Sequence, residues 1–267
     1  MNRAQQALYE MKQTDELAMM DSPVHRFSAL SKLMVTVIYI VTVMSFSKYD
    51  FGGVFMMALY PYLVFQLSGL SFQLCMYRMR YVIPLVAFVG IFNPFIDRTV
   101  MFQAGFLSVT GGMISFVTLM IKGILCLCAA FLLSGTAPVD EICGALRRLH
   151  VPSVFVTVFL LAYRYMSVLM EEVAVMSDAY HLRAPRQKGI AFEAWGSFLG
   201  QLLLRSMDRA QELYAAMQLR GYDGEFRQTG NTKDRSVSFV WFVVWTAVFL
   251  ILRFVPAASL IGNLFVR

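Results

Sequence analysis

Two segments of the sequence place an arginine at the same spacing from an alanine. They are Ala179–Arg183 and Ala216–Arg220, and a small residue follows the arginine in both. A guanidinium is permanently charged and presents a planar set of donors, which suits it to carboxylates or backbone carbonyls of a partner. One such arginine would only complement a helix C-terminal dipole, an effect of about 0.3–1 kcal/mol, but a repeated pair favours docking into two equivalent sockets. The predicted contact residues are Ala179, Arg183, Ala184, Ala216, Arg220 and Gly221.

Each segment comes at the end of a predicted helix. From Ser153 the pattern predicts one helix of about 30 residues, which ends at Arg183 because Pro185 follows. A second helix is expected to stop at Gly221. The predicted linker between the two helices contains Gly189, Gly196 and Gly200.

A short amphipathic helix precedes the first long helix. Pro138 suits its first turn, and the acidic residues Asp140 and Glu141 favour the positive end of the helix dipole. Its apolar residues recur at helical spacing, which predicts one face at the membrane interface. They are Ile142, Ala145, Leu146 and Leu149.

The composition is that of an integral membrane protein. Hydrophobic residues make up 58% of the 267 residues, charged residues only 15%, and the mean hydropathy is +0.61. We expect an all-α fold with about five transmembrane helices, together with one short and two long cytoplasmic helices. A sixth apolar run, Val151–Met170, leaves six spans as the alternative. The five predicted spans are Ala29–Phe46, Phe51–Leu70, Tyr81–Ile96, Leu107–Leu133 and Ser236–Phe254.

Charge placement predicts the orientation. Lysines and arginines gather near the N-terminus, at Arg78 and Arg80, and between Arg147 and Arg235. By the positive-inside rule these regions and the N-terminus are cytoplasmic. We therefore divide the chain into a membrane domain with four spans (1–133), cytoplasmic coupling helices (134–235) and a last span (236–267). The net charge of +6 favours a membrane surface over nucleic acid.

The sequence resembles the transmembrane T component of energy-coupling factor transporters, the CbiQ/EcfT family. The segment Asp21–Arg26 followed by Lys32, the helix at Thr136 and Pro138, and the two arginine-tipped helices before one final span occur in the family's order. The resemblance covers nearly the whole chain. Its most specific part is Leu203–Gly224, and the ending from Arg220 to Gly224 is similar to the cobalt and nickel branch.

The resemblance implies a coupling subunit in a bacterial or archaeal inner membrane that is not itself catalytic. Its partners would be two ATP-binding cassette ATPase subunits, which hold the arginine tips, and a substrate-binding membrane subunit of the S or CbiM type. This chain would bind no cofactor, since ATP and magnesium belong to the partner subunits. The apolar surface that meets the substrate-binding subunit is expected to include Pro138, Ile142, Leu146, Leu149, Val154, Val158 and Leu161.

Some residues are also compatible with other functions. A shared T component for vitamin uptake is the nearest alternative. A stand-alone secondary transporter would use Lys122 in the fourth span and Asn93-Pro94, and an intramembrane metalloprotease would use Glu171, Glu172 and His181. The chain has no GxxxxGK[ST] loop, and its three histidines and four cysteines show no metal-site or disulfide spacing.

Overall fold

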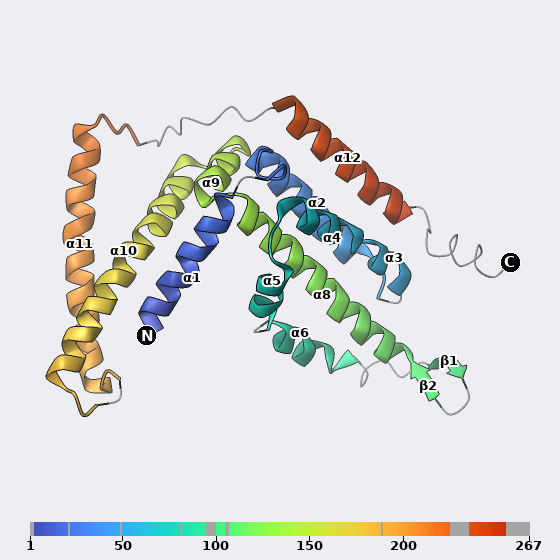
Figure 1. Ribbon diagram of the computed structural model, residues 1–267, viewed down its shortest axis with the longest axis horizontal. Coiled ribbons are helices and arrows are strands. Elements are labelled where there is room, and N and C mark those ends of the chain that lie inside the picture. Colours follow the sequence, from blue (N-terminus) through green and yellow to red (C-terminus); the bar gives the residue numbers. More distant parts are fainter. Residues whose placement is uncertain are drawn as a thin grey trace. The chain divides into compact units, whose positions relative to one another are not determined.

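The computed structural model folds into two compact units (Figure 1). The arm unit consists of Met1–Glu16 and Val139–Gly230, and the bundle unit consists of Leu17–Pro138 and Asn231–Arg267. The residues that the structure describes are 3–20, 22–48, 50–80, 82–93, 100–104, 107–187, 189–224 and 235–254.

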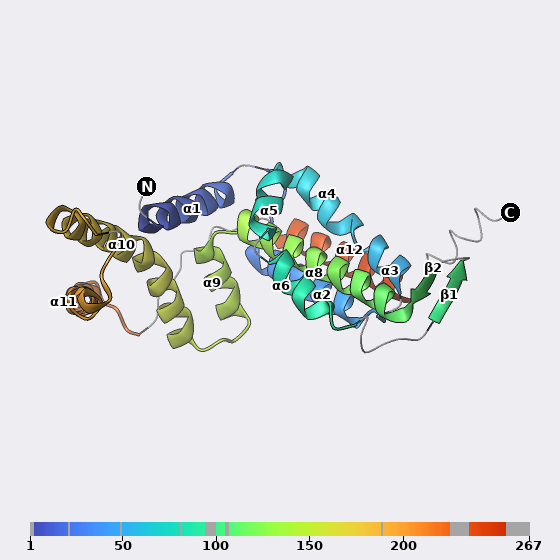
Figure 2. The same cartoon turned by 90° about the horizontal axis from the view of Figure 1, so that it is seen from below.

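The bundle unit is helical apart from one small hairpin. Strands β1 (Val100–Ala104) and β2 (Leu107–Thr110) pair antiparallel, and α8 begins directly after them. The helix α2 packs against both α8 and α12, and α6 packs against α8 (Figure 2). The helices are α2 (Ala29–Ser45), α3 (Phe51–Met56), α4 (Leu59–Ser68), α5 (Phe72–Met79), α6 (Ile83–Gly90), α8 (Gly111–Thr136) and α12 (Arg235–Phe254).

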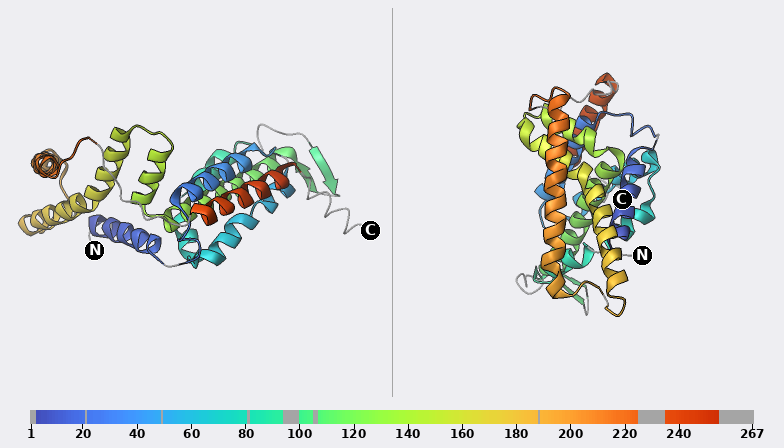
Figure 3. Two further views of the ribbon diagram at one scale, coloured as in Figure 1. Left: turned by 90° about the horizontal axis from the view of Figure 1, so that it is seen from above. Right: turned by 90° about the vertical axis from the view of Figure 1, so that its left-hand side faces the viewer.

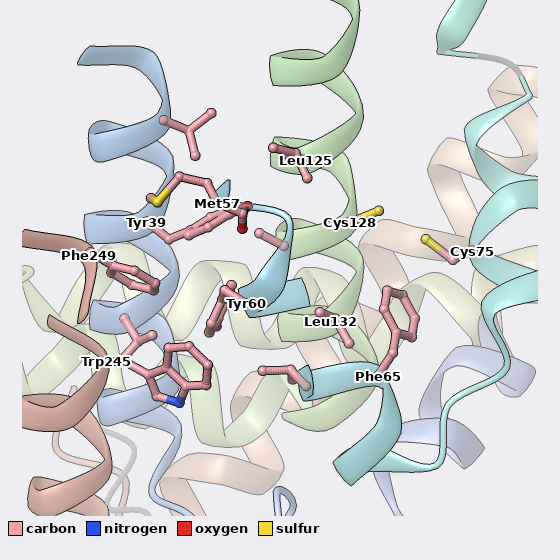
Figure 4. Close-up of a cluster of buried hydrophobic side chains, with 14 of the residues drawn as sticks. Tyr39, Met57, Tyr60, Phe65, Cys75, Leu125, Cys128, Leu132, Trp245 and Phe249 are labelled. Carbon is pink, nitrogen blue, oxygen red and sulfur yellow. Dashed lines mark hydrogen bonds between the residues drawn. The ribbon is translucent and has the colours of Figure 1, made fainter. Parts of the chain in front are cut away.

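An aromatic cluster forms the centre of the bundle unit (Figure 4). The ring of Tyr60 in α4 lies 4.6 Å from that of Tyr39 in α2, 4.8 Å from Trp245 and 5.2 Å from Phe249 in α12. Edge-to-face and tilted pairs of this kind add about 0.5–1.5 kcal/mol each to the burial of their apolar surface. The last helix therefore packs with the N-terminal apolar helices as one body.

The predicted span Phe51–Leu70 is not one continuous helix, because it is interrupted between α3 and α4. Pro61 has no N–H group to bond the carbonyl of Met57 four residues earlier. That carbonyl accepts the amide of Tyr60 at 3.3 Å and the hydroxyl of Tyr39 at 3.0 Å. The break is thus stabilised by a side chain from another helix.

Two further boundaries differ from prediction. Within Tyr81–Ile96 the described helix is only α6, and α5 precedes it at a bend of 52°. Pro84 lies in the first turn of α6, where it ends any continuation from α5; residues 81 and 94–96 lie outside the described part. The run from Leu107 begins with β2, so the helix starts at Gly111.

The all-α membrane fold is confirmed. Among the described residues, three helices are long and apolar enough to cross a membrane: α8, α10 (Ser153–Arg183) and residues Ser236–Phe254 of α12. The bent pair of α5 and α6 would make a fourth, and two apolar segments are shorter: α2, and Gly52–Ser68 with its break between α3 and α4. Five spans, with six as the alternative, stay a prediction.

The arm unit contains the predicted short and long helices. They are α9 (Val139–Arg148), α10 (Ser153–Arg183) and α11 (Trp195–Leu219), with a 3₁₀ turn η1 (Phe192–Ala194) before α11. The bounds predicted for α10 are confirmed, and α1 (Arg3–Ala18) contributes all but its last two residues to this unit. The predicted linker was too long, because Gly196 and Gly200 lie inside α11.

The end of α9 carries an unusual histidine. The amide of His150 donates to the carbonyl of Arg147 at 3.1 Å, and the amide of Val151 donates to that of Leu146 at 3.3 Å. These two bonds form a Schellman motif, whose left-handed residue is usually glycine. Here it is His150, with a φ of 64°.

Candidate docking site at two helix ends

The first arginine lies at the end of α10. No glycine or proline interrupts this helix, and its last turn is closed by the amide of Ala184, which donates to the carbonyl of Tyr180 at 2.9 Å. Ala184 then leaves helical geometry because Pro185 follows. The hydroxyl of Tyr180 donates to Oε1 of Gln187 at 2.6 Å and accepts the amide of Ala191 at 3.2 Å. One tyrosine therefore holds the loop beyond Arg183 against the helix.

The second arginine lies at the end of α11, which terminates differently. The amide of Gly221 donates to the carbonyl of Gln218 at 3.0 Å, and the amide of Tyr222 donates to that of Met217 at 3.0 Å. Gly221 has a φ of 80°, so this is a Schellman motif with glycine at the left-handed position. Arg220 is the last residue before the chain turns away.

Both helix ends are exposed. Arg183 and Arg220 are on the surface, and within the described residues neither guanidinium has a hydrogen bond or ion pair. The preceding leucines are nearly free of contacts, because Leu182 is 84% exposed and Leu219 90%. Of the other predicted contact residues, Ala179, Ala216 and Gly221 are exposed and Ala184 is half-buried.

The two leucines were missed as candidate contact residues. They stand at equivalent positions of the repeat, which was the available signal, but a leucine near a helix end is more often a packing residue. An exposed leucine beside an exposed arginine offers a partner both apolar area and charge. Arginine is enriched among the residues that contribute most of the binding energy at protein interfaces.

The two helix ends point away from each other. Helices α10 and α11 run in opposite directions in the arm unit (Figures 1 and 3), and an ion pair joins Glu172 of α10 to Arg205 of α11. From this contact the helices rise about 16 Å to Arg183 and about 22 Å to Arg220 at 1.5 Å per residue. The ends are therefore up to about 40 Å apart, too far for one small socket.

A second candidate surface lies on α9 and the first turns of α10. The two helices pack through Cys143 and Arg147 of α9 and Val156, Thr157 and Leu160 of α10, which line a small pocket. Most of the predicted contact residues lie outside this packing: Leu149, Val154 and Val158 are exposed, and Ile142, Leu146 and Leu161 are half-buried. Pro138 is half-buried and belongs to the bundle unit. Phe155 and Phe159 are also exposed, at 70% and 53%, although the sequence prediction omitted them.

Three of the residues behind the alternative functions make contacts within the chain. The amine of the buried Lys122 donates to the carbonyl of Phe46 at the end of α2, at 2.6 Å. Glu171 lies 3.6 Å from Lys12, and Glu172 pairs with Arg205. In the described part of the chain no three histidines, cysteines or acidic residues form a group that could hold a metal ion, and the four cysteines are free thiols. Pro94 lies outside the described residues.

Comparison with known families defines the class of this membrane protein. The CbiQ family, described as "Cobalt transport protein", matches residues 20–231. The chain therefore belongs to this family. The match contains the short helix, both arginine-tipped helices and most of the bundle unit, and it begins after α1.

Relatives carry related descriptions. The chain is 25% identical over 240 residues to the energy-coupling factor transporter transmembrane protein EcfT of Lactococcus lactis, covering 82% of this chain and 86% of that protein. It is 31% identical over 96 residues to the nickel permease LarQ of Lactiplantibacillus plantarum, covering 36% and 35% of the two chains. It is 34% identical over 98 residues to the cobalt transport protein CbiQ of Rhodobacter capsulatus, covering 36% and 39%. The LarQ and CbiQ alignments span only 35% and 39% of those relatives' lengths.

Proposed function

We propose that this chain is the energy-coupling membrane subunit of a cobalt or nickel importer of the energy-coupling factor type. The two arginine-tipped helix ends would each enter a groove on one of two ATPase subunits, on the cytoplasmic side together with the N-terminus. ATP binding and hydrolysis take place on those subunits, so this chain is not an enzyme. Its role is to pass their motion to a substrate-binding membrane subunit.

The observation that carries this proposal is the placement of the two ends. They repeat one sequence pattern, expose the same leucine and arginine, and lie at opposite ends of an antiparallel helix pair. A single partner with one groove would contact only one of them. Two equivalent subunits that approach and separate during an ATP cycle would engage both and move α10 and α11 as levers.

The metal assignment rests on the family description and on the relatives described as nickel and cobalt transport proteins. The transported ion is bound by the partner in this proposal. The exposed residues Leu149, Val154, Phe155, Val158 and Phe159 would face that substrate-binding subunit, as apolar surface outside the packing of α9 on α10.

The test is a double charge reversal, Arg183→Glu with Arg220→Glu, in the chain expressed with its ATPase and substrate-binding subunits. Copurification of both ATPase subunits, ATP hydrolysis and uptake of radioactive cobalt or nickel are expected to be lost, whereas membrane insertion is kept. The matched control is Arg164→Glu with Arg209→Glu, which makes the same change of charge at exposed positions away from the ends. The control is expected to resemble the wild type.

Two results would reject the proposal. One is solute uptake by the purified chain alone, as a secondary transporter would show. The other is an unchanged ATPase content in the double variant. If the purified wild-type complex contained a substrate-binding subunit specific for a vitamin, the coupling role would stand. The transported substrate would then be a vitamin and not a metal ion.

A further inference from the structure

The N-terminal helix α1 has an unexplained place in the arm unit. It lies before the family match, which begins at residue 20, so its presence is not accounted for by the family's pattern. Its described side chains are mostly polar, including Glu10, Lys12, Asp15 and Glu16. A polar helix of 16 residues is marginal in water by itself, and it needs tertiary contacts to persist.

Two contacts fasten α1 to α10. The hydroxyl of Tyr163 donates to Oδ1 of Asp15 at 2.6 Å, and both residues are half-buried. One turn earlier in α1, the amine of Lys12 lies 3.6 Å from the carboxylate of Glu171. The earlier residue of α1 thus contacts the later residue of α10, which means that the two helices are antiparallel (Figure 1).

These contacts differ in strength. The pair of Lys12 and Glu171 is exposed on both sides, so solvent and salt screen it and it adds little. The bond from Tyr163 to Asp15 is short, half-buried and made to a charged acceptor, a class of hydrogen bond that is stronger than neutral ones. Asp15 and Tyr163 are thus the main attachment.

The weaker contact, between Lys12 and Glu171, lies next to the contact between α10 and α11. Glu171 pairs with α1, and the next residue, Glu172, pairs with Arg205 of α11. Adjacent carboxylates of α10 therefore bind a helix on either flank, near the middle of the lever that carries Arg183.

We infer that α1 is a brace that stays attached to α10 throughout the transport cycle, and that Asp15 and Tyr163 are the positioning residues that hold it. This inference rests on the proposed coupling function. The brace limits bending of α10, so that motion imposed at Arg183 reaches the α9 end of the helix. Without the brace, ATP hydrolysis continues but less substrate moves for each ATP.

The experiment uses the complete complex in lipid vesicles, with Tyr163→Phe and Asp15→Asn made singly and together. Hydrogen exchange of the α1 amides reports attachment, and we expect a rise of roughly tenfold, the fold-change that losing a hydrogen bond to a charged group gives. Substrate transported per ATP is expected to fall severalfold, while copurification of the ATPase subunits is unchanged. Tyr165→Phe and Glu16→Gln, which alter neighbouring residues without a contact to the other helix in the described structure, are the matched controls.

The outcomes separate this inference from the coupling function. If α1 exchanges faster and transport per ATP stays at the wild-type value, α1 is not a brace. If exchange is unchanged in the double variant, Asp15 and Tyr163 do not hold the helix, and the inference is again wrong. If the wild-type chain retains no ATPase subunits, the proposed function fails, but the exchange measurement still shows whether α1 is attached.

Discussion

The ends of α10 and α11 present the same side chains on different backbones. At Arg220 a Schellman motif with Gly221 turns the chain through main-chain bonds alone. At Arg183 the residue that follows is alanine, Pro185 ends the helix, and the side chain of Tyr180 holds the returning loop. The two ends therefore share an exposed leucine and arginine, whereas the turns that follow them differ.

The largest effect is expected from reversing one arginine at a time. With Arg220→Glu the second groove is lost and the first is kept, so the complex should retain one ATPase subunit in place of two. With Arg183→Glu the first groove is lost and the second is kept, so one ATPase subunit should again be retained. The cost at the altered end is about 2 kcal/mol or more, roughly a 30-fold loss of affinity, because the partner's groups are left without their cation. Native mass spectrometry counts the subunits, and loss of both ATPases from either single variant would show that the ends do not bind independently.

The exposed leucines give the next effect. Leu182→Ser and Leu219→Ser each remove apolar area that becomes buried in the complex, at about 1.5–3 kcal/mol for a fully buried leucine. Each should raise the dissociation rate of one ATPase subunit without changing the stability of the isolated chain, since both side chains are already exposed. Surface-immobilised chain and purified ATPase measure this rate. Leu204→Ser, at a 58% exposed position within α11, is the control, and an equal effect there would remove the special role of the ends.

The arm unit was predictable where local signals agree. Pro152 and Pro185 bracket a stretch free of glycine and proline, so both ends of α10 follow from the sequence. The six residues predicted to contact a partner lie in or just after the last turns of α10 and α11, although their contact role stays a prediction. That the two ends point apart was not predictable, because it depends on how α11 packs on α10, with Glu172 and Arg205 distant in sequence.

The bundle unit was predictable in class and less so in detail. Its apolar runs indicate membrane helices, but hydropathy does not show where they break. The interruption at Met57 depends on Pro61 and on a hydroxyl supplied by Tyr39 from another helix. Hairpin β1–β2 was hidden for a similar reason, since its residues Leu107–Thr110 continue the apolar run of α8. The composition of a segment indicates whether it lies in the membrane or in water. Where its helix is interrupted depends on contacts with other segments.

A smaller effect separates the two Schellman motifs. At Gly221 an added methyl group would meet open space, so Gly221→Ala tests backbone strain alone, at about 1–2 kcal/mol for a left-handed residue with a side chain. The reverse change, His150→Gly, should stabilise the end of α9 by about 1 kcal/mol. Hydrogen exchange at the amides of Tyr222 and Val151, which each motif protects, should rise in the first variant and fall in the second. The exchange rates must therefore change in opposite directions. A rise in both variants would show that His150 is not strained.

The smallest effect concerns the loop after Arg183. Tyr180→Phe keeps the ring but removes the hydroxyl that bonds Gln187 and the amide of Ala191, a change of about 0.5–1.5 kcal/mol. The amide of Ala191 should exchange faster, and the ATPase subunit at the first end should bind several times more weakly, because part of its binding energy then goes into ordering the loop. The subunit at the second end should be unaffected, since Gly221 turns the chain there through main-chain bonds. Tyr214→Phe, at an exposed position of α11, is the control. If Tyr180→Phe weakened both ends equally, the loop would act through the helix pair as a whole, and the two ends would not be independent docking elements.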